Sequence, residues 1–328
     1  MRLILFGGIL IMCVLWLSIE GSGKTITVDD DGGEDYEKIQ YAIDNSTEGD
    51  TIRVYEGNYL ENVVVNVSVS LLGNGSEETT IDGGGNGDVV EINVDWVNLS
   101  GFKIINGNNT EGRGIHVESN FSHIFDNFCS NVYTGINLLR SDYCEISNNT
   151  CENNNEGIRL STSSNCSIIN NTCLSSDRGI LLTSSSICRI ISNKCMNNDR
   201  GIDIWRSDEC IVSNNICENN QKGIYLSHSD NCEITFNSCL TNYDTGYGIY
   251  LYASNHCYIV NNICKDNEAY GIFIDNSHDT YIRNNGGIVK DEMVDNENDG
   301  FIPGFEIVLM IGSIGVIVFL KGKVNISN

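Results

Sequence analysis

The chain has 328 residues, with 44 acidic and 19 basic side chains and a formal net charge of −25. This excess of negative charge argues against nucleic-acid binding, because phosphate recognition requires Lys and Arg. It favours a well-solvated protein and an attraction for divalent cations.

Residues 1–22 have the pattern of a signal peptide. Arg2 supplies a positive start, Leu3 to Leu17 is an apolar run, and small residues near Gly21 offer a cleavage site. The alternative is an uncleaved membrane anchor, because no Ala-x-Ala motif is present. Both interpretations predict an exported protein.

Residues 25–85 predict one short helix followed by short strands and turns. From Asp35 to Ile43, the apolar residues Ile39, Ala42 and Ile43 share one helix face. The segments Gly49 to Val54 and Glu61 to Val65 follow as strands and turns. This succession resembles the amino-terminal cap of the pectin-lyase-like superfamily. The resemblance implies that the helix closes the open end of a stacked core.

A tandem repeat begins near Cys129 and governs the rest of the architecture. Its Gly residues, each followed by Ile, recur at a period of 22, with two late steps of 25 and 23: Gly135, Gly157, Gly179, Gly201, Gly223, Gly248 and Gly271. A fixed period of this size indicates stacked units that share one continuous core. Such a solenoid fits in a single domain.

Within each unit, apolar residues alternate in twos, which is the period of a strand. Cys, Ile, Asn and Cys recur at fixed offsets, as in Cys144, Ile146, Asn149 and Cys151. We therefore predict an all-β parallel β-helix over residues 25–285, with three strands per coil of about 22 residues and regular coils over 114–285. A leucine-rich repeat is the alternative, but its apolar position is occupied here by a Ser column that includes Ser141 and Ser163.

The columns also predict roles. The Gly column indicates a turn that needs positive φ or no side chain, and the Asn column predicts amide ladders that pair backbone groups. Thirteen Cys fall in two columns, while Cys13 lies in the leader. We interpret the columns as small buried hydrophobes, with disulfides between coils or a metal-binding thiol array as alternatives.

Phrases such as Gly223-Ile224-Tyr225-Leu226-Ser227 resemble the right-handed β-helix repeat family. That family includes a periplasmic protein that helps insert copper into nitrous-oxide reductase and many archaeal surface proteins. The resemblance covers residues 25–285 and implies either a surface role or a copper-handling role.

Outward positions of the strand after each Gly bring aromatic residues together in the last four coils. The candidates are Trp205, Tyr225, Tyr250, Tyr252 and Phe273, with Asp203 and Asp275 at the edges. Exposed aromatics on a flat sheet suit the stacking of sugar rings. The sequence thus predicts a non-catalytic glycan-binding or partner-binding face. The alternative is a face covered by a loop near Tyr243 and Tyr247.

A polysaccharide-active enzyme, either a lyase or a glycoside hydrolase, is a further alternative. A glycosidase needs two carboxylates about 5 to 10 Å apart, whereas Asp203 and Asp275 are expected about 14 Å apart across three coils. Arg159 is the only basic residue expected on that face, two coils from Asp203. No catalytic residue is therefore assigned.

Metal sites have weak support. His228, His256 and His278 fall in one turn region, but at different offsets. The stretch Asp295 to Gly300 imitates a calcium loop, with Glu306 as its last ligand. We expect no resident cofactor, with calcium as the alternative.

The carboxy-terminal region is expected to anchor the protein. An acidic linker spans 286–301, and Pro303-Gly304-Phe305 precedes an apolar run that ends in basic residues. This arrangement resembles the sorting signal of archaeal surface proteins, which implies processing by an archaeosortase-like enzyme. Residues 302–323 are the predicted transmembrane helix and 324–328 the cytoplasmic tail. A plain single-pass anchor is the alternative.

Sequons fit a surface glycoprotein, although Asn-rich turns also produce them by chance. The candidate acceptors are Asn45, Asn66, Asn74, Asn98, Asn108 and Asn120. The protein is expected on the outer face of the cell membrane, as a monomer.

Overall fold

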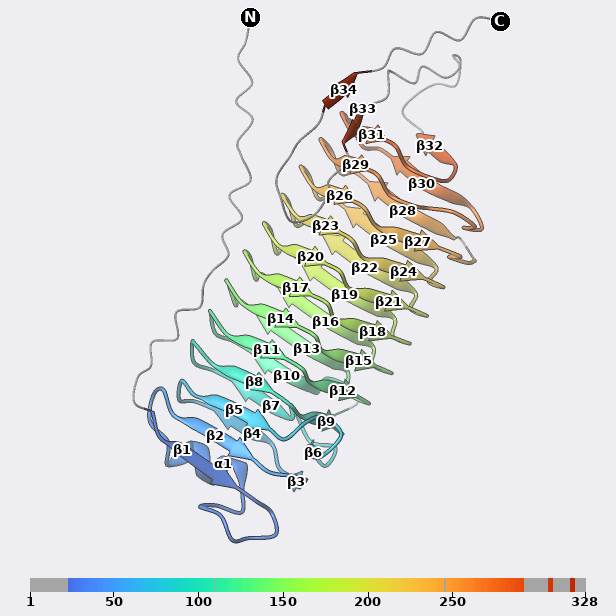
Figure 1. The fold of residues 1–328 in the computed structure, drawn as a ribbon. Coiled ribbons are helices and arrows are strands. Elements are labelled where there is room, and N and C mark those ends of the chain that lie inside the picture. Colours follow the sequence, from blue (N-terminus) through green and yellow to red (C-terminus); the bar gives the residue numbers. More distant parts are fainter. Residues whose placement is uncertain (1–22, 109, 245, 292–305, 309–318, 322–328) are drawn as a thin grey trace, which may run out of the picture. The chain divides into compact units, whose positions relative to one another are not determined.

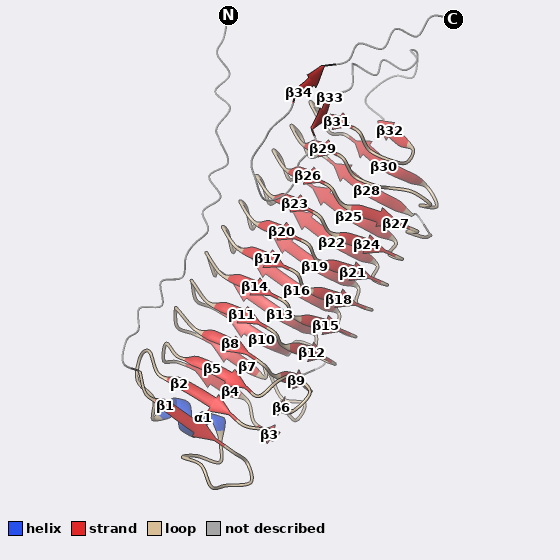
Figure 2. Ribbon diagram, viewed as in Figure 1, coloured by secondary structure: helices blue, strands red, loops and turns tan. Residues whose placement is uncertain are grey.

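The computed structural model describes residues 23–108, 110–244, 246–291, 306–308 and 319–321. By internal contacts the chain separates into two units, Met1–Met293 and Val294–Asn328. Within the first unit, the chain winds through three sheets of parallel strands stacked coil on coil (Figures 1 and 2). The predicted parallel β-helix with three strands per coil is confirmed.

Sheet A contains twelve of the described strands. They are β1 (Thr25–Val28), β2 (Thr51–Val54), β5 (Ser70–Gly73), β8 (Asn98–Ser100), β11 (His123–Phe125), β14 (Glu145–Ser147), β17 (Ser167–Ile169), β20 (Arg189–Ile191), β23 (Ile211–Ser213), β26 (Glu233–Thr235), β29 (Tyr258–Val260) and β31 (Tyr281–Arg283).

Sheet B contains nine described strands. They are β3 (Gly57–Leu60), β6 (Thr79–Asp82), β9 (Lys103–Ile105), β12 (Phe128–Ser130), β15 (Thr150–Glu152), β18 (Thr172–Leu174), β21 (Lys194–Met196), β24 (Ile216–Glu218) and β27 (Ser238–Leu240).

Sheet C contains eleven described strands and, in its middle, the longest ones. They are β4 (Val63–Val65), β7 (Val90–Ile92), β10 (Arg113–Val117), β13 (Thr134–Leu139), β16 (Glu156–Ser161), β19 (Arg178–Thr183), β22 (Arg200–Trp205), β25 (Lys222–Ser227), β28 (Tyr247–Tyr252), β30 (Tyr270–Asp275) and β32 (Val289–Asp291).

The interior is formed by the columns that the sequence predicted. Ile158, Leu160, Ile168 and Cys173 have no exposed surface, and the same holds for their counterparts in neighbouring coils. The thirteen cysteines that the structure describes are all free and buried, so they act as small core residues. Burial raises the pKa of the Cys239 thiol, which keeps it protonated in the core.

Asn ladders join the coils through buried amides. The side chain of Asn171 donates to the carbonyl of Ile146 at 2.8 Å, and its oxygen accepts from the amide of Asn149 at 2.9 Å. Ser hydroxyls form a second ladder, in which Ser163 accepts from the amide of Ser141 at 3.0 Å. These bonds pair backbone groups that the turns remove from the sheets.

Two reasons were expected for the Gly column, a positive φ or the need for no side chain, and the second one applies. Gly179 and its equivalents lie at the start of sheet C strands, and none of them has a left-handed backbone. A Cβ at Gly179 would lie 2.6 Å from the carbonyl oxygen of Gly201. Close approach of neighbouring coils therefore requires glycine, whereas Asn148 (φ 56°) and Asn170 (φ 56°) take left-handed turn positions.

The expected amino-terminal helix is present but shorter than predicted. Helix α1 spans Ile39–Asp44 and buries Ile39, Ala42 and Ile43. It packs against β1, β2 and β4. The carboxylate of Glu61 accepts from the amides of Ile39 and Gln40 at 3.0 and 3.1 Å, which satisfies two free donors of the first turn.

The predicted transmembrane helix falls mostly outside the described residues. Two described segments within it, β33 (Glu306–Val308) and β34 (Phe319–Lys321), are strands that pair antiparallel. None of the helices among the described residues has the length and apolar character needed to traverse a bilayer. The sorting motif Pro303-Gly304-Phe305 and the calcium-like loop at 295–300 also lie outside the described residues, so both stay predictions.

Candidate functional site

The seven residues predicted as a binding face lie on four neighbouring strands of sheet C. Asp203, Tyr225, Tyr250 and Phe273 are register partners across β22, β25, β28 and β30. Trp205 and Tyr252 belong to a second column on the same strands, which ends at Asp275. The sequence pattern therefore predicted correctly that these residues lie on neighbouring strands of one sheet.

Their exposure differs from the expectation. Trp205 is 39% exposed and Tyr252 is 36% exposed, whereas Phe273 is 8% and Asp203 only 3% exposed. The rings of Tyr247 and Tyr270 stack on Phe273 with centroids 5.0 and 5.6 Å apart. The predicted exposed position of Phe273 was therefore wrong, because these neighbouring aromatic rings cover it.

Asp275 and Tyr250 are linked at the aromatic end of the face. The hydroxyl of Tyr250 donates to the carboxylate of Asp275 at 3.2 Å. Burial and this carboxylate raise the pKa of Tyr250 above its ordinary value. The two predicted residues thus hold each other in place on the sheet.

A third column on this face was missed from the sequence. It consists of the residue immediately before each Gly, and register pairing aligns its members from strand to strand: Thr134, Glu156, Arg178, Arg200, Lys222, Tyr247 and Tyr270. Its position in the repeat is as regular as that of the predicted columns. It was overlooked because simple alternation assigns the residue before Gly to the same face as Ile.

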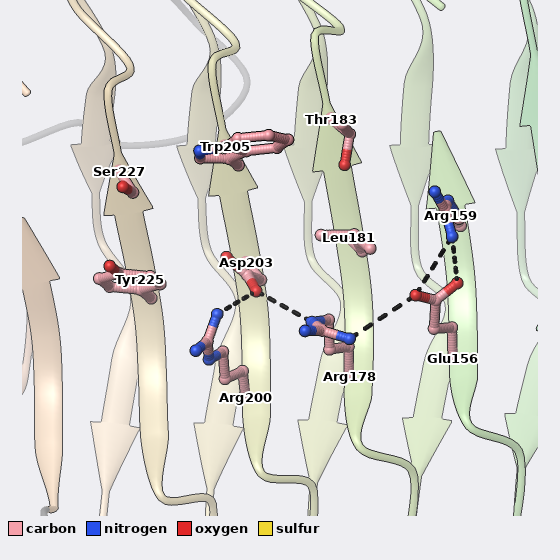
Figure 3. Close-up of a pocket in the computed structure, with 10 residues that line it drawn as sticks. All are labelled: Glu156, Arg159, Arg178, Leu181, Thr183, Arg200, Asp203, Trp205, Tyr225 and Ser227. Carbon is pink, nitrogen blue, oxygen red and sulfur yellow. Dashed lines mark hydrogen bonds and ion pairs between the residues drawn. The ribbon is translucent and has the colours of Figure 1, made fainter. Parts of the chain in front are cut away.

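Five charged side chains form a continuous chain of ion pairs across β16, β19 and β22 (Figure 3). Glu156 binds Arg159 at 3.2 Å and Arg178 at 3.7 Å. Asp203 binds Arg178 at 3.2 Å and Arg200 at 2.7 Å. Each carboxylate side chain is 4% exposed, whereas each guanidinium-bearing side chain is 35 to 36% exposed. The carboxylates lie underneath, and the arginines face solvent.

We call Arg159, Arg178 and Arg200 the arginine row. The expectation that Arg159 is the only basic residue on this face was therefore wrong. An open hollow of about 470 Å³ lies over the row and is also lined by Leu181, Trp205 and Tyr225. In Figure 3, Trp205 and Tyr225 lie beside the row on β22 and β25. Cationic and aromatic groups thus surround one hollow.

Cations also lie against the aromatic rings. The Arg200 guanidinium is 4.9 Å and the Lys222 ammonium 4.5 Å from the centroid of Tyr225. Lys222 is also 4.9 Å from Tyr250. Burial, and then the charge of Arg200, lower the pKa of Lys222. These contacts fix the positions of both ring and cation.

The arrangement does not provide a glycosidase pair. Glu156 and Asp203 are two strands apart, and Asp203 lies three residues further along its strand than Arg200, the residue in register with Glu156. Arg178 binds both carboxylates from between them. Each carboxylate is held by two guanidiniums and is almost fully buried, so neither is free to protonate a leaving group or activate water.

The other candidate centres do not assemble. His228 contacts Ser227 at 2.9 Å, and His256 contacts Asp279 at 3.6 Å. Among the described residues, no group of three or more His, Cys, Asp or Glu side chains is arranged to hold a metal ion. The expected divergence of the three histidines is consistent with this finding.

A Glu-His-Ser cluster on sheet A also lacks the geometry of a proton relay. The Nε2 atom of His123 is 3.2 Å from Glu145 and 2.8 Å from Ser147. A relay needs the carboxylate and the hydroxyl on different ring nitrogens. The cluster therefore crosslinks neighbouring strands and provides no activated nucleophile.

The predicted glycosylation acceptors differ in accessibility. Asn45, Asn66 and Asn74 are exposed. Asn98 and Asn120 are half-buried, and their side chains bond Ser70 and the amide of Asp142. Asn108 is also half-buried. The first three are the better acceptors on accessibility alone.

The family model described as periplasmic copper-binding protein (NosD) matches residues 43–243 and 202–302. The chain belongs to the NosD family. The family description refers to the periplasm, which agrees with the expected location outside the cytoplasm. Thiols are ligands suited to soft copper. In one of the two cysteine columns of this NosD-family chain, the buried thiols donate to backbone carbonyls, as Cys166 does to that of Ser141 at 3.1 Å.

Solved structures with the same fold include three carbohydrate-active or phage proteins. The mannuronan C-5 epimerase AlgE6 A-module of Azotobacter vinelandii aligns at a TM-score of 0.58 and 15% identity, over 77% of this chain and 94% of the module. A polygalacturonase from Erwinia carotovora aligns at 0.57 and 13%, over 82% and 97%. The Dettilon tailspike protein aligns at 0.54 and 16%, over 74% and 64%. These similarities show the fold alone. A search of curated proteins finds no match.

Proposed function

We propose that this NosD-family protein binds a glycan on sheet C and does not cleave it. The observation that carries the proposal is the open hollow in which the arginine row lies beside Trp205 and Tyr225. Guanidinium groups donate several hydrogen bonds in fixed directions, and aromatic rings offer apolar faces to sugar rings. Together they provide orientation and contact area for a carbohydrate.

The state of Glu156 and Asp203, which are buried and each bound by two arginines, favours binding over catalysis. Glu156 and Asp203 serve to position the arginines. The similar structures include an epimerase and a polygalacturonase by their names, so a polysaccharide-active enzyme is the alternative function. Copper handling is the second alternative, and the family description favours it.

The proposal includes a location. An exported protein that is anchored through residues 302–323 would hold the binding face outside the cell, where polysaccharides are found. An archaeosortase-like enzyme acting at Pro303-Gly304-Phe305 is the expected processing partner. Mass analysis of the membrane-extracted protein tests this part, because an intact carboxy terminus with no added lipid contradicts processing.

The binding test is a glycan array probed with the full chain, followed by mass analysis of every captured glycan. Trp205→Ala should lose most of the retention, because it removes an exposed ring beside the hollow. Trp96→Ala is the matched control, because Trp96 is 55% exposed and stacks on Phe121, away from the sheet C strands. Equal retention by both variants contradicts the proposal. A shortened glycan would establish the enzyme alternative.

A further inference from the structure

We infer that the glycan is an acidic polysaccharide that lies along the solenoid axis, with its carboxylates over the arginine row and Lys222. This inference rests on the proposed function and adds the charge, the orientation and the length of the ligand. It follows from a second hollow, from the charge of the solvent-facing groups and from their spacing.

The second hollow continues the first one along sheet C. It has a volume of about 480 Å³ and is lined by residues that include Arg113, Tyr133 and Asn137. Arg159 lines both hollows. Together the lining residues extend over β10, β13, β16, β19, β22 and β25. Five strand steps correspond to about 24 Å, so the groove suits an extended polymer that crosses the strands.

The groups that face solvent in this groove are mostly cationic. Arg113 pairs with Asp88 at 3.1 Å, and the Asp88 side chain is 18% exposed against 35% for the arginine. Glu156 and Asp203 lie still deeper beneath the arginine row. Glu111, at the rim of the second hollow, is the one exposed carboxylate among the residues that line the two hollows.

This local balance contrasts with the chain as a whole. Four cations (Arg113, Arg159, Arg178 and Arg200) and three carboxylates (Glu111, Glu156 and Asp203) line the two hollows, and two of the carboxylates are buried. The whole chain, by contrast, has a net charge of −25. A polyanion is therefore repelled less at this groove than over the rest of the surface.

The donor geometry favours carboxylates that are carried on sugars. Arg178 uses its Nε for Asp203 and one terminal nitrogen for Glu156, and Arg200 uses one terminal nitrogen for Asp203. Each guanidinium has five N–H donors, so further donors remain for a ligand carboxylate. Trp205 and Tyr225 provide the adjacent ring faces. Cations on successive strands repeat at about 4.8 Å, which suits a polymer with one charge on each repeating unit.

The test measures the affinity of the full chain for oligomers of a uronic acid, graded in length, and for the same oligomers after reduction of their carboxylates to alcohols. The acidic oligomers should bind at least about tenfold more tightly, a difference of about 1.4 kcal/mol. Their affinity should fall with added salt and should rise with length until the oligomer spans about five coils. Equal affinity for the reduced oligomers overturns the inference but leaves the proposed function intact. Failure of both forms to bind overturns the inference, and the glycan array then decides the proposed function separately.

Lys222→Gln and Arg200→Gln should each weaken binding of the acidic oligomers about tenfold and should weaken binding of the reduced oligomers less. Arg189→Gln is the matched control, because it removes the same charge from an exposed position on sheet A. Thermal unfolding of each variant reports whether it folds, and Lys222→Gln disturbs no buried ion pair among those described. Equal losses of affinity for the acidic oligomers in all three variants overturn the inference. The inference is also overturned if single-stranded DNA competes effectively with the acidic oligomers, or if the affinity stops rising once the oligomer is a disaccharide.

Discussion

Replacement of Asn171 by Ala tests whether the Asn ladder holds the coils together. The Asn171 side chain is buried and bonds three neighbouring segments. Its loss leaves the amide of Asn149 without its 2.9 Å acceptor and the carbonyl of Ile146 without its 2.8 Å donor. The oxygen of Asn193 keeps a donor, because the amide of Asn171 remains at 2.8 Å.

The expected destabilisation follows from these two groups. A buried polar group that loses its partner costs about 1 to 3 kcal/mol, so the pair predicts a loss of about 2 to 6 kcal/mol. That is a large part of the stability of a typical domain, which is about 5 to 15 kcal/mol. Because each coil contacts only its neighbours, the loss should be concentrated in the coils of β14 and β17.

The assay is urea unfolding followed by circular dichroism, together with amide hydrogen exchange in the affected coils. The adjacent Asn170→Gly is the control, because Asn170 is exposed and its φ of 56° is one that glycine adopts readily. Its effect should stay within about 1 kcal/mol. If Asn171→Ala changes the free energy of unfolding no more than this control, or if exchange at Asn149 is unaltered, the ladder is not a principal source of stability.

Three further outcomes are expected. Burial, followed by the charge of Arg113, lowers the pKa of His116. The unfolded state therefore binds more protons at this residue than the folded state does. The free energy of unfolding should consequently fall as the pH drops below about 6.5. Urea titrations at several pH values should show a flatter dependence for His116→Gln. Thiol-labelling reagents should leave the native protein almost unmodified and label thirteen core cysteines after unfolding; mass spectra that show disulfides would contradict this. Gly201→Ala places a Cβ 2.6 Å from the carbonyl oxygen of Gly223 and should lower the free energy of unfolding by about 1 to 3 kcal/mol. Gly286→Ala is the control, because the nearest neighbour of its Cβ is the flexible side chain of Lys265. It should lower the free energy of unfolding less in the same assay.

The interior of this protein was predictable because stacking imposes the same requirement on every coil. Ile158, Ile180 and Ile202 occupy identical surroundings and pair in register, so the sequence repeats them. Asn171 and Ser163 recur for the same reason, since each satisfies its neighbour in the next coil. A period read from the sequence therefore predicts both the fold and the strand register.

The candidate site was only half predictable, because alternation alone misassigned the residue before each Gly. Each strand begins at this position, one residue before the glycine, and Glu156, Arg178 and Arg200 join the outward face. The burial of Asp203 was also not predicted, because it depends on Arg200 of its own strand and on Arg178 of the neighbouring strand, which both bind it. The pairing with Arg178 joins two coils and does not appear when one coil is considered alone.

Core packing does not fix the residue types at the outward positions of a solenoid. A change of residue type along an outward column therefore points to a function of that surface. Along the column before Gly, the residues change from Glu156 through Arg178, Arg200 and Lys222 to Tyr247. The core beneath them stays constant, so packing does not require this change. The face is therefore cationic over β19, β22 and β25 and aromatic over β28 and β30. A polymer that lies along this face contacts cations at one end and aromatic rings at the other. The two ends of the groove therefore differ, which predicts that the polymer binds in one preferred orientation.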